Sequence, residues 1–163
     1  KEIITKAANQ GIYILYAPWN IASGSGKPTG GLPYAPHVSG SDATVMPSQQ
    51  AFVDFWGGVA NELKPYNNVL FDIFNEANGT SAQKTEWKST CNQVVNTIRS
   101  SGSTNLGVVQ WDYQVIPDKY TNPIGRWALD WVEDYAATIT GSNVVYSTHA
   151  YLDRGNWSGS DFA

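Results

Sequence analysis

Asn75 and Glu76 stand at the abrupt end of an apolar run and are the residues of this sequence best placed to do chemistry. The run, residues 69–74, consists mostly of apolar strand formers without polar alternation, as in a parallel strand covered on both faces. In parallel α/β proteins, ligands bind outside the carboxyl ends of the strands. We therefore expect Glu76 to be a catalytic carboxylate. Asp72, inside the run, is expected to be a buried, hydrogen-bonded structural carboxylate.

His149 and Tyr151 form a second candidate pair, at the end of another apolar run that begins at Val144. Side chains two positions apart in a strand point to the same side of the sheet. The pair is therefore expected to share one site, although His149 alone would more often be a hydrogen-bonded structural histidine.

Aromatic residues are unusually numerous, with 7 Trp, 9 Tyr and 5 Phe. Trp19, Trp111 and Trp157 lie in or next to expected loops, and a flat apolar ring with a polar tip suits the face of a sugar ring. Asp112, at the end of a further expected strand, is an additional candidate for a substrate contact. These residues favour a carbohydrate ligand.

Alternating stretches of strand-like and helix-like periodicity position the candidate residues. Strands are expected at residues 12–17, 69–74, 106–110 and 144–148, and helices at residues 1–10, 48–63, 81–101 and 128–138. Such alternation predicts an α/β protein with a parallel sheet and right-handed crossovers, either doubly wound or a barrel. Residues 18–47, rich in Gly, Ser and Pro, are expected to form a functional loop because of their length.

Composition excludes several classes of protein. The chain has 10 Lys plus Arg against 14 Asp plus Glu, and its scattered basic residues argue against nucleic-acid binding. No apolar run approaches the roughly 18 residues of a membrane span. Cys91 stands alone, and His37 and His149 have no metal-ligand spacing, so we expect no disulfide within the chain, no metal and no cofactor.

The sequence starts as if inside a helix, without an N-cap before its first apolar stripe. We expect residues 1–163 to be a single-domain fragment that begins in the middle of a domain. Gly24-Ser25-Gly26-Lys27 is set aside as a phosphate loop, because Pro28 replaces the Ser or Thr that would hold magnesium.

Two segments resemble motifs of a known family. Residues 68–78, NVLFDIFNEAN, resemble the Asn-Glu motif that ends the fourth strand in glycoside hydrolase family 5, and more broadly in the retaining glycosidases built on (β/α)8 barrels. Residues 144–151, VVYSTHAY, are similar to that family's sixth-strand His-x-Tyr motif. The motifs occur in the family's order with one strand between them. The resemblance implies a partial (β/α)8 TIM barrel covering about strands three to six.

The resemblance also implies roles for individual residues. Glu76 would be the general acid/base, Asn75 the neighbour that hydrogen-bonds near the sugar 2-hydroxyl, and His149 and Tyr151 the pair that shapes the site around the nucleophile. Retaining hydrolysis needs two carboxyl groups about 5–5.5 Å apart, one protonated and one ionised. The family's nucleophile is a Glu on strand seven, which this chain is expected to lack. The remainder of the barrel would then be required, and the chain alone is expected to be inactive.

Two positions depart from the family pattern. Strand three of the family commonly ends in a motif containing His, whereas this sequence offers Trp19 and Asn20, which we assign to substrate binding and which leave the substrate open. Ala77 follows the Asn-Glu pair where many relatives have Pro, a change that we expect to be tolerated.

The sequence therefore predicts part of a retaining β-glycoside hydrolase, foremost an endo-β-1,4-glucanase (cellulase) acting on polysaccharide. The alternatives are a β-mannanase or another β-glycanase of the same fold, and a non-hydrolytic carbohydrate-binding barrel that lost the nucleophile. A doubly wound nucleotide-binding domain is disfavoured because no glycine-rich turn follows any expected strand. The resemblance further implies a secreted protein.

Overall fold

A four-stranded parallel sheet is the centre of the computed structural model, which describes residues 1–18, 32–34, 46–77, 81–111 and 131–148. Its strands are β1 (Ile14–Tyr16), β2 (Val69–Asp72), β3 (Gly107–Gln110) and β4 (Val144–Ser147), which lie side by side in chain order. All three neighbouring pairs within this sheet are parallel. The strand order and direction expected from the sequence are confirmed.

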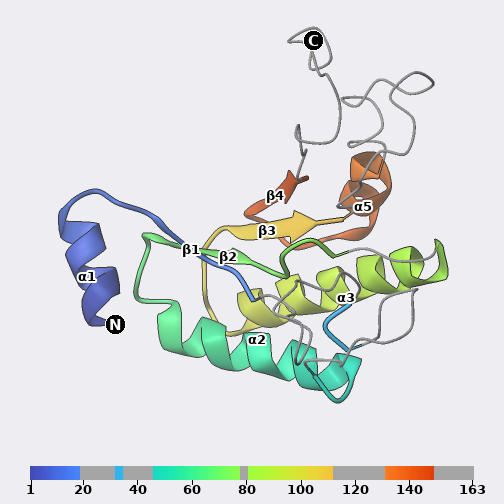
Figure 1. Ribbon diagram of the computed structural model, residues 1–163, viewed down its shortest axis with the longest axis horizontal. Helices are drawn as coiled ribbons and strands as arrows, with labels where there is room; N and C mark the ends of the chain where they lie inside the picture. The colour runs from blue at the N-terminus through green and yellow to red at the C-terminus, as the bar shows by residue number, and fades with distance from the viewer. Residues whose placement is uncertain (19–31, 35–45, 78–80, 112–130, 149–163) are drawn as a thin grey trace, which may run out of the picture.

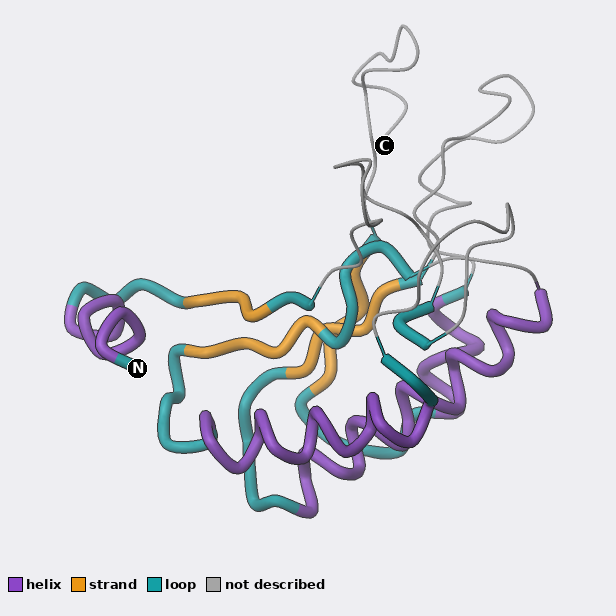
Figure 2. Tube along the Cα trace, turned by 60° about the horizontal axis from the view of Figure 1, so that its bottom comes forward, coloured by secondary structure: helices purple, strands orange, loops and turns teal. Residues whose placement is uncertain are grey.

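The described helices are α1 (Glu2–Asn9), α2 (Gln49–Leu63), α3 (Ser81–Ser100) and α5 (Val132–Thr138). Helices α2 and α3 run side by side beneath one face of the sheet, while α1 lies apart, beyond the amino end of β1 (Figures 1 and 2). The N-terminal end of α1 is tied to α2 by an ion pair between Lys1 and Glu62. No helix in the described ranges has the length and apolar character needed to cross a membrane.

Local chemistry explains where these elements begin and end. Helix α2 starts at a Ser48 N-cap whose hydroxyl accepts a hydrogen bond from Ala51 N at 3.1 Å. Helix α3 is followed by Gly102, whose positive φ of 83° is the left-handed conformation common after helix ends. Strand β2 ends at Asp72, earlier than the expected Phe74. Ile73 N still donates to Val108 O at 2.9 Å, but the chain then turns before it could extend the ladder.

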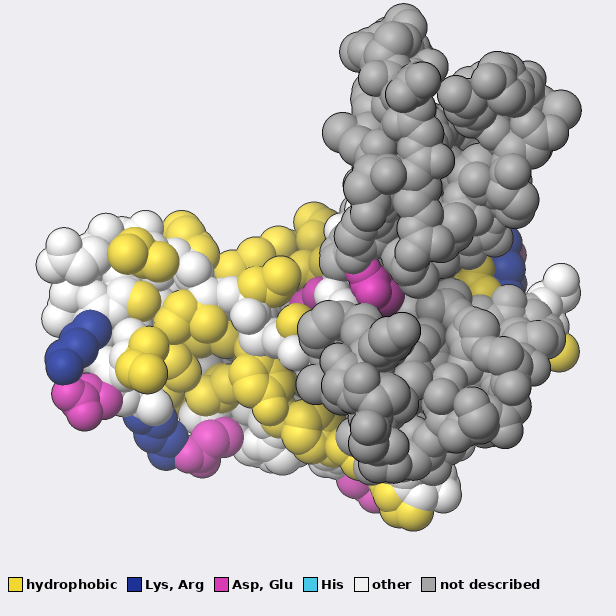
Figure 3. All heavy atoms as spheres, viewed as in Figure 1, with side chains coloured by type: hydrophobic (Ala, Val, Ile, Leu, Met, Phe, Trp, Pro, Cys, Tyr) yellow, Lys and Arg dark blue, Asp and Glu magenta, His cyan; other side chains and the backbone are white. Residues whose placement is uncertain are grey.

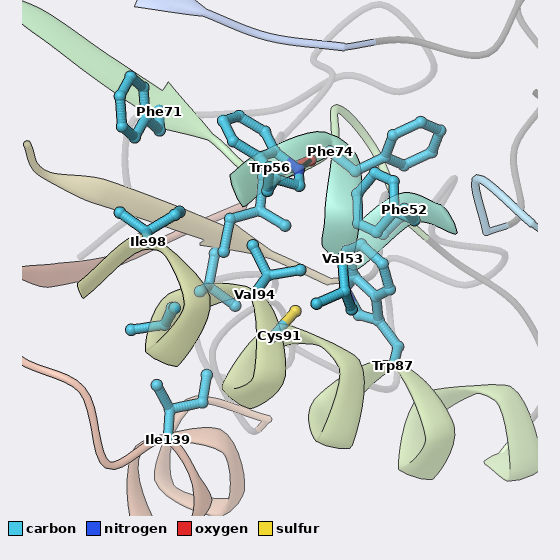
Figure 4. Packing of buried hydrophobic residues seen from close by; sticks show 14 of the residues in the cluster. Phe52, Val53, Trp56, Phe71, Phe74, Trp87, Cys91, Val94, Ile98 and Ile139 are labelled. Atoms are coloured by element: carbon cyan, nitrogen blue, oxygen red, sulfur yellow. Dashed lines mark hydrogen bonds between the residues drawn. The ribbon is translucent and has the colours of Figure 1, made fainter. Parts of the chain in front are cut away.

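The hydrophobic core fills the layer between the sheet and helices α2 and α3 (Figure 4). Phe52 and Trp56 come from α2, Trp87 from α3 and Phe71 from β2, and none of these side chains is more than 1% exposed. Ring centroids 5.6–5.8 Å apart join Trp56 to Phe71 and Phe52 to Trp87. Aromatic pairs at such distances contribute about 0.5–1.5 kcal/mol beyond the burial of their area. This packing holds β2 firmly in place.

The two faces of the sheet differ in cover. On the helix side, Phe71 and Val109 are fully buried in the core cluster. On the other side, which we call the inner face, Leu15 is 54% exposed and Val145 is 39% exposed. Because side chains alternate along a strand, Leu70, opposite Leu15, belongs to the same inner face. The described helices therefore cover one face of the sheet and leave an apolar inner face.

Candidate functional site

The turn after β2 is tied to the ends of both neighbouring strands. Asn75 N donates to Pro18 O at 3.0 Å, just beyond β1. Glu76 N donates to the side-chain oxygen of Gln110, the last residue of β3, at 3.1 Å. The Asn-Glu pair therefore lies at the carboxyl edge of the sheet, where parallel α/β proteins bind their ligands.

Glu76 has a backbone conformation that is rare for its residue type. Its φ is +58°, in the left-handed region, and the residue is only 8% exposed. For residues other than glycine this conformation costs roughly 1–2 kcal/mol, and it persists only where the surrounding structure enforces it. Such strain at a carboxylate next to a sheet edge is typical of a functional site.

A buried hydrogen-bonded chain connects this turn to β2 itself. Gln110 Nε2 donates to Asp72 Oδ2 at 2.5 Å, while Gln110 Oε1 accepts from Glu76 N. Gln110 is 3% exposed and Asp72 1% exposed. The structural role expected for Asp72 is thus confirmed: its carboxylate is buried and hydrogen-bonded. Gln110 was not among the residues singled out from the sequence, although a single amide ending an apolar strand was the available signal.

Two buried indoles fix the carbonyl groups at the same edge. Trp56 Nε1 donates to Ile73 O at 3.2 Å, and Trp87 Nε1 donates to Gln110 O at 2.8 Å. Both tryptophans are completely buried, so their N–H groups cannot reach water, and these carbonyls are the acceptors that they need. The ends of β2 and β3 are therefore held from the helix side as well as from the sheet.

The inner face changes character along the strands. Its apolar side chains are Leu70, Val108 and Val145, of which Val108 lies between Asp72 of β2 and Val145 of β4. Its polar side chains are Asp72 and Gln110, the last residues of β2 and β3. Apolar side chains along the strands and polar side chains at their carboxyl ends are typical of a barrel with a packed interior and an active site at the carboxyl ends.

Trp111 requires a correction. It was expected to present its ring to a sugar, but it is 4% exposed, belongs to the core cluster and lies 6.5 Å from Tyr135 of α5, ring centroid to ring centroid. The physical reason is strand alternation: because Gln110 points to the inner face, the next residue points to the helix side. In this structure Trp111 is a packing residue.

The other residues expected at the site lie outside the described residues. They are Trp19, Asn20, Asp112, His149, Tyr151 and Trp157. Strand β4 ends at Ser147, opposite Gln110, so the described chain approaches the same edge just before the His-x-Tyr segment. Of the expected catalytic residues, the structure thus places Asn75 and Glu76.

Cys91 does not qualify as a nucleophile. Its side chain is fully buried among core residues of α3, as Figure 4 shows. Burial raises the pKa of the Cys91 thiol well above 9.0, and the negative charge of Asp72 raises it further. The thiol is therefore protonated at neutral pH and inert. Among the described residues, no three His, Cys, Asp or Glu side chains gather as metal ligands would.

Comparison with known proteins gives a consistent result. Residues 1–161 match the family model described as cellulase (glycosyl hydrolase family 5). Similar solved structures include an endo-β-1,4-glucanase from Xanthomonas axonopodis pv. citri, at 23% identity and a TM-score of 0.62 over 94% of this chain and 44% of that one. Cel5A (EG2) from Hypocrea jecorina (Trichoderma reesei) has 21% identity and a TM-score of 0.63 over 93% of this chain and 41% of that one.

A β-mannanase from Thermomonospora fusca is also similar, at 16% identity and a TM-score of 0.57 over 92% of this chain and 43% of that one. The chain thus spans less than half the length of these structures. The likeness confirms the expected fold class, α/β with a parallel sheet that corresponds to part of a (β/α)8 barrel.

Proposed function

Because the chain belongs to glycosyl hydrolase family 5, we propose that it supplies the general acid/base, Glu76, of a retaining β-glycoside hydrolase. The observation that carries this proposal is the position of Glu76: a buried carboxylate at the carboxyl edge of the sheet, whose backbone is held by Gln110 of the neighbouring strand. An enclosed carboxylic acid on a rigid support is what protonation of a glycosidic oxygen requires.

In the proposed mechanism, Glu76 first protonates the leaving-group oxygen and later, as a carboxylate, activates the water that releases the product. Asn75 would hydrogen-bond near the sugar 2-hydroxyl, a contact that strengthens in the transition state. The nucleophile would come from the remainder of the barrel, about 5–5.5 Å from Glu76. His149 and Tyr151 would shape the site around that nucleophile.

For the substrate we propose a β-1,4-linked glucan. The glucanases from Xanthomonas axonopodis and Hypocrea jecorina, at 23% and 21% identity, are more similar to this chain than the mannanase at 16%. A structure of the Xanthomonas enzyme holds cellopentaose and one of the mannanase holds mannohexaose. A β-mannan is therefore the second candidate, and Trp19, Asn20, Asp112 and Trp157 are the residues proposed to select between them.

The acid/base role is tested by Glu76→Gln in the full-length protein that carries this sequence. The variant cannot donate a proton, so we expect kcat/KM on unactivated polysaccharide to fall by about 10²–10⁴-fold. On aryl glycosides with good leaving groups, which need little protonation, we expect a loss of less than about 10-fold in the glycosylation step. Steady-state and single-turnover hydrolysis of both substrates measure the difference.

Glu86→Gln is the matched control, because it makes the same change of carboxylate to amide at an exposed position of α3. It should leave both activities within about twofold, as expected of exposed substitutions. Equal losses on the two substrates in Glu76→Gln would contradict an acid/base role.

Parallel assays on soluble cellulose and mannan derivatives test the substrate. We expect the higher kcat/KM on the glucan, and a preference for mannan would reverse the assignment. Binding of either polymer without any turnover by the full-length protein would instead favour a non-hydrolytic carbohydrate-binding barrel. Because the polymer cannot enter a cell, the proposal includes secretion, which fractionation of a culture of the source organism into medium and cells would test.

A further inference from the structure

We propose that Gln110 is a positioning residue for Glu76, and that Asp72 orients Gln110 for this task. The inference rests on the proposed acid/base role of Glu76. It adds which residues hold the Glu76 carboxyl group in position. It is carried by the two hydrogen bonds of one buried amide, 3.1 Å to Glu76 N and 2.5 Å to Asp72 Oδ2.

The chemistry of the two partners determines the orientation of the amide. A backbone N–H can only donate and an ionised carboxylate can only accept, so the Gln110 oxygen must face Glu76 and its nitrogen must face Asp72. An amide provides one acceptor and one donor group side by side. Glutamate would lose the donor when ionised, and methionine would provide neither.

The backbone of Gln110 is fixed independently of its side chain. Strand β3 is paired on both sides, and Trp87 Nε1 holds Gln110 O at 2.8 Å. Gln110 therefore reaches across to the turn after β2 from a rigid base. Because its partner is the backbone N–H of Glu76 itself, the contact acts on the left-handed backbone from which the catalytic side chain projects.

Loss of the Gln110 side chain would have two effects. It would lower stability, because the buried Asp72 carboxylate would lose a donor, and it would free the Glu76 backbone to relax from its rare conformation. The carboxyl group would then be misplaced relative to the glycosidic oxygen, and misplacement by about 1 Å costs as much as 10²-fold in rate. Only reactions that depend on proton donation by Glu76 would suffer the full loss.

The test is Gln110→Met in the full-length protein, compared with Asn105→Leu. Asn105 is also a buried amide, but it donates to Tyr66 O and Val69 O at the opposite end of β2. We expect Gln110→Met to lower kcat/KM on unactivated polysaccharide by about 10–100-fold and on activated aryl glycosides by less than about threefold. Asn105→Leu should lower thermal stability yet affect the two substrates equally.

A double-mutant cycle with Glu76→Gln shows whether Gln110 acts through Glu76. Once the acid is absent, its placement no longer matters. Gln110→Met should therefore cause less than about a twofold further loss on polysaccharide in the Glu76→Gln background. If the loss of kcat/KM in the double variant equals the product of the losses in the two single variants, the positioning role is overturned.

Hydrogen exchange provides a readout apart from activity. In protein labelled with ¹⁵N-glutamate, the Glu76 amide should exchange at least about 10-fold faster in Gln110→Met than in the wild type, with little change in Asn105→Leu. Unchanged exchange of the Glu76 amide in Gln110→Met would overturn this inference alone. So would equal losses on polysaccharide and aryl glycosides in Gln110→Met, provided that Glu76→Gln shows the expected split, a larger loss on polysaccharide than on aryl glycosides. Absence of that split in Glu76→Gln would instead overturn the proposed function.

Discussion

At the scale of single residues, the site depends on pairing each buried polar group with a partner of opposite hydrogen-bonding type. Gln110 lies between a donor, Glu76 N, and an acceptor, Asp72 Oδ2. Cys91, in contrast, is buried among apolar groups and its thiol is held in the neutral form. Low exposure alone therefore does not determine the chemistry of a polar residue, because the groups packed around it decide which hydrogen bonds it can make.

The Cys91 thiol gives a prediction for alkaline pH. Burial raises its pKa in the folded chain, so the unfolded chain releases this proton first, and the free energy of unfolding falls as pH rises above 9.0. The slope should approach about 1.4 kcal/mol per pH unit for this one proton. Urea unfolding at about pH 8, 9 and 10 measures it.

Cys91→Ala is the control for this prediction, because it removes the proton. Burial also raises the pKa of Tyr146 above 10.0, and that of Tyr34 more strongly, so some alkaline destabilisation should remain in the variant. Between about pH 9 and 10 the variant should lose less stability than the wild type. Identical pH profiles of the two proteins would count against the raised pKa of Cys91.

At the scale of elements, helix α2 shows that packing and intrinsic propensity act separately. Its buried side places Phe52, Trp56 and Ala60 in the core. Gly57 and Gly58 lie in the middle of this helix, although glycine has a poor helical propensity. The two glycines differ in their surroundings. A Cβ at Gly57 would lie 3.1 Å from Thr97 Cγ2, whereas one at Gly58 would meet nothing within 4 Å.

Gly58→Ala should raise the free energy of unfolding by about 0.5–1 kcal/mol, because alanine loses less backbone entropy on folding and has free space here. Gly57→Ala is the matched comparison, with the same gain in propensity offset by the close contact with Thr97. We expect it to stabilise less than Gly58→Ala or to destabilise. Thermal and urea unfolding of the two variants measure the difference, and a larger gain from Gly57→Ala would contradict the packing described here.

At the scale of the whole molecule, the apolar side chains that lie at the surface are as informative as the buried ones. Ile3 on α1 and Leu15 on β1 are 76% and 54% exposed. Figure 3 shows apolar side chains gathered over the part of the molecule where Figure 1 places α1 and β1. Among the described strands β1 has a neighbour on one side only, and exposed apolar side chains beside such an edge favour association with another polypeptide segment.

We therefore expect the 163-residue chain, produced alone, to self-associate. We also expect it to lack hydrolytic activity, because in the proposed mechanism the nucleophile would come from the remainder of the barrel. Leu15→Lys should reduce self-association in sedimentation velocity, since a charge on an edge strand opposes pairing. In the full-length protein the same change should lower the free energy of unfolding by more than about 3 kcal/mol, because Leu15 would be buried in the barrel.

Ile3→Lys on α1 is the comparison for this effect, and it should reduce self-association less than Leu15→Lys does. If Leu15→Lys leaves the free energy of unfolding of the full-length protein unchanged, the inner face is not covered in that protein. Robust turnover by the chain alone, abolished by Glu76→Ala, would show that a nucleophile exists within these residues.

The sequence by itself determined the order, type and approximate bounds of the described strands and helices, and the position of Glu76 after a buried strand. These features depend on local information, namely apolar periodicity, caps and breaking residues, which neighbours in the chain provide. Parallel pairing then followed from the alternation of strands and helices.

Only the tertiary structure decided what depends on register between distant segments. Gln110 contacts Glu76 and Asp72, which are 34 and 38 positions away, and no local pattern specifies those contacts. The same register turned Trp111 toward the helices, where it packs in the core. A shift by one residue would exchange every side chain between the two faces of the sheet, so these residues acquire their roles only once the strands are aligned.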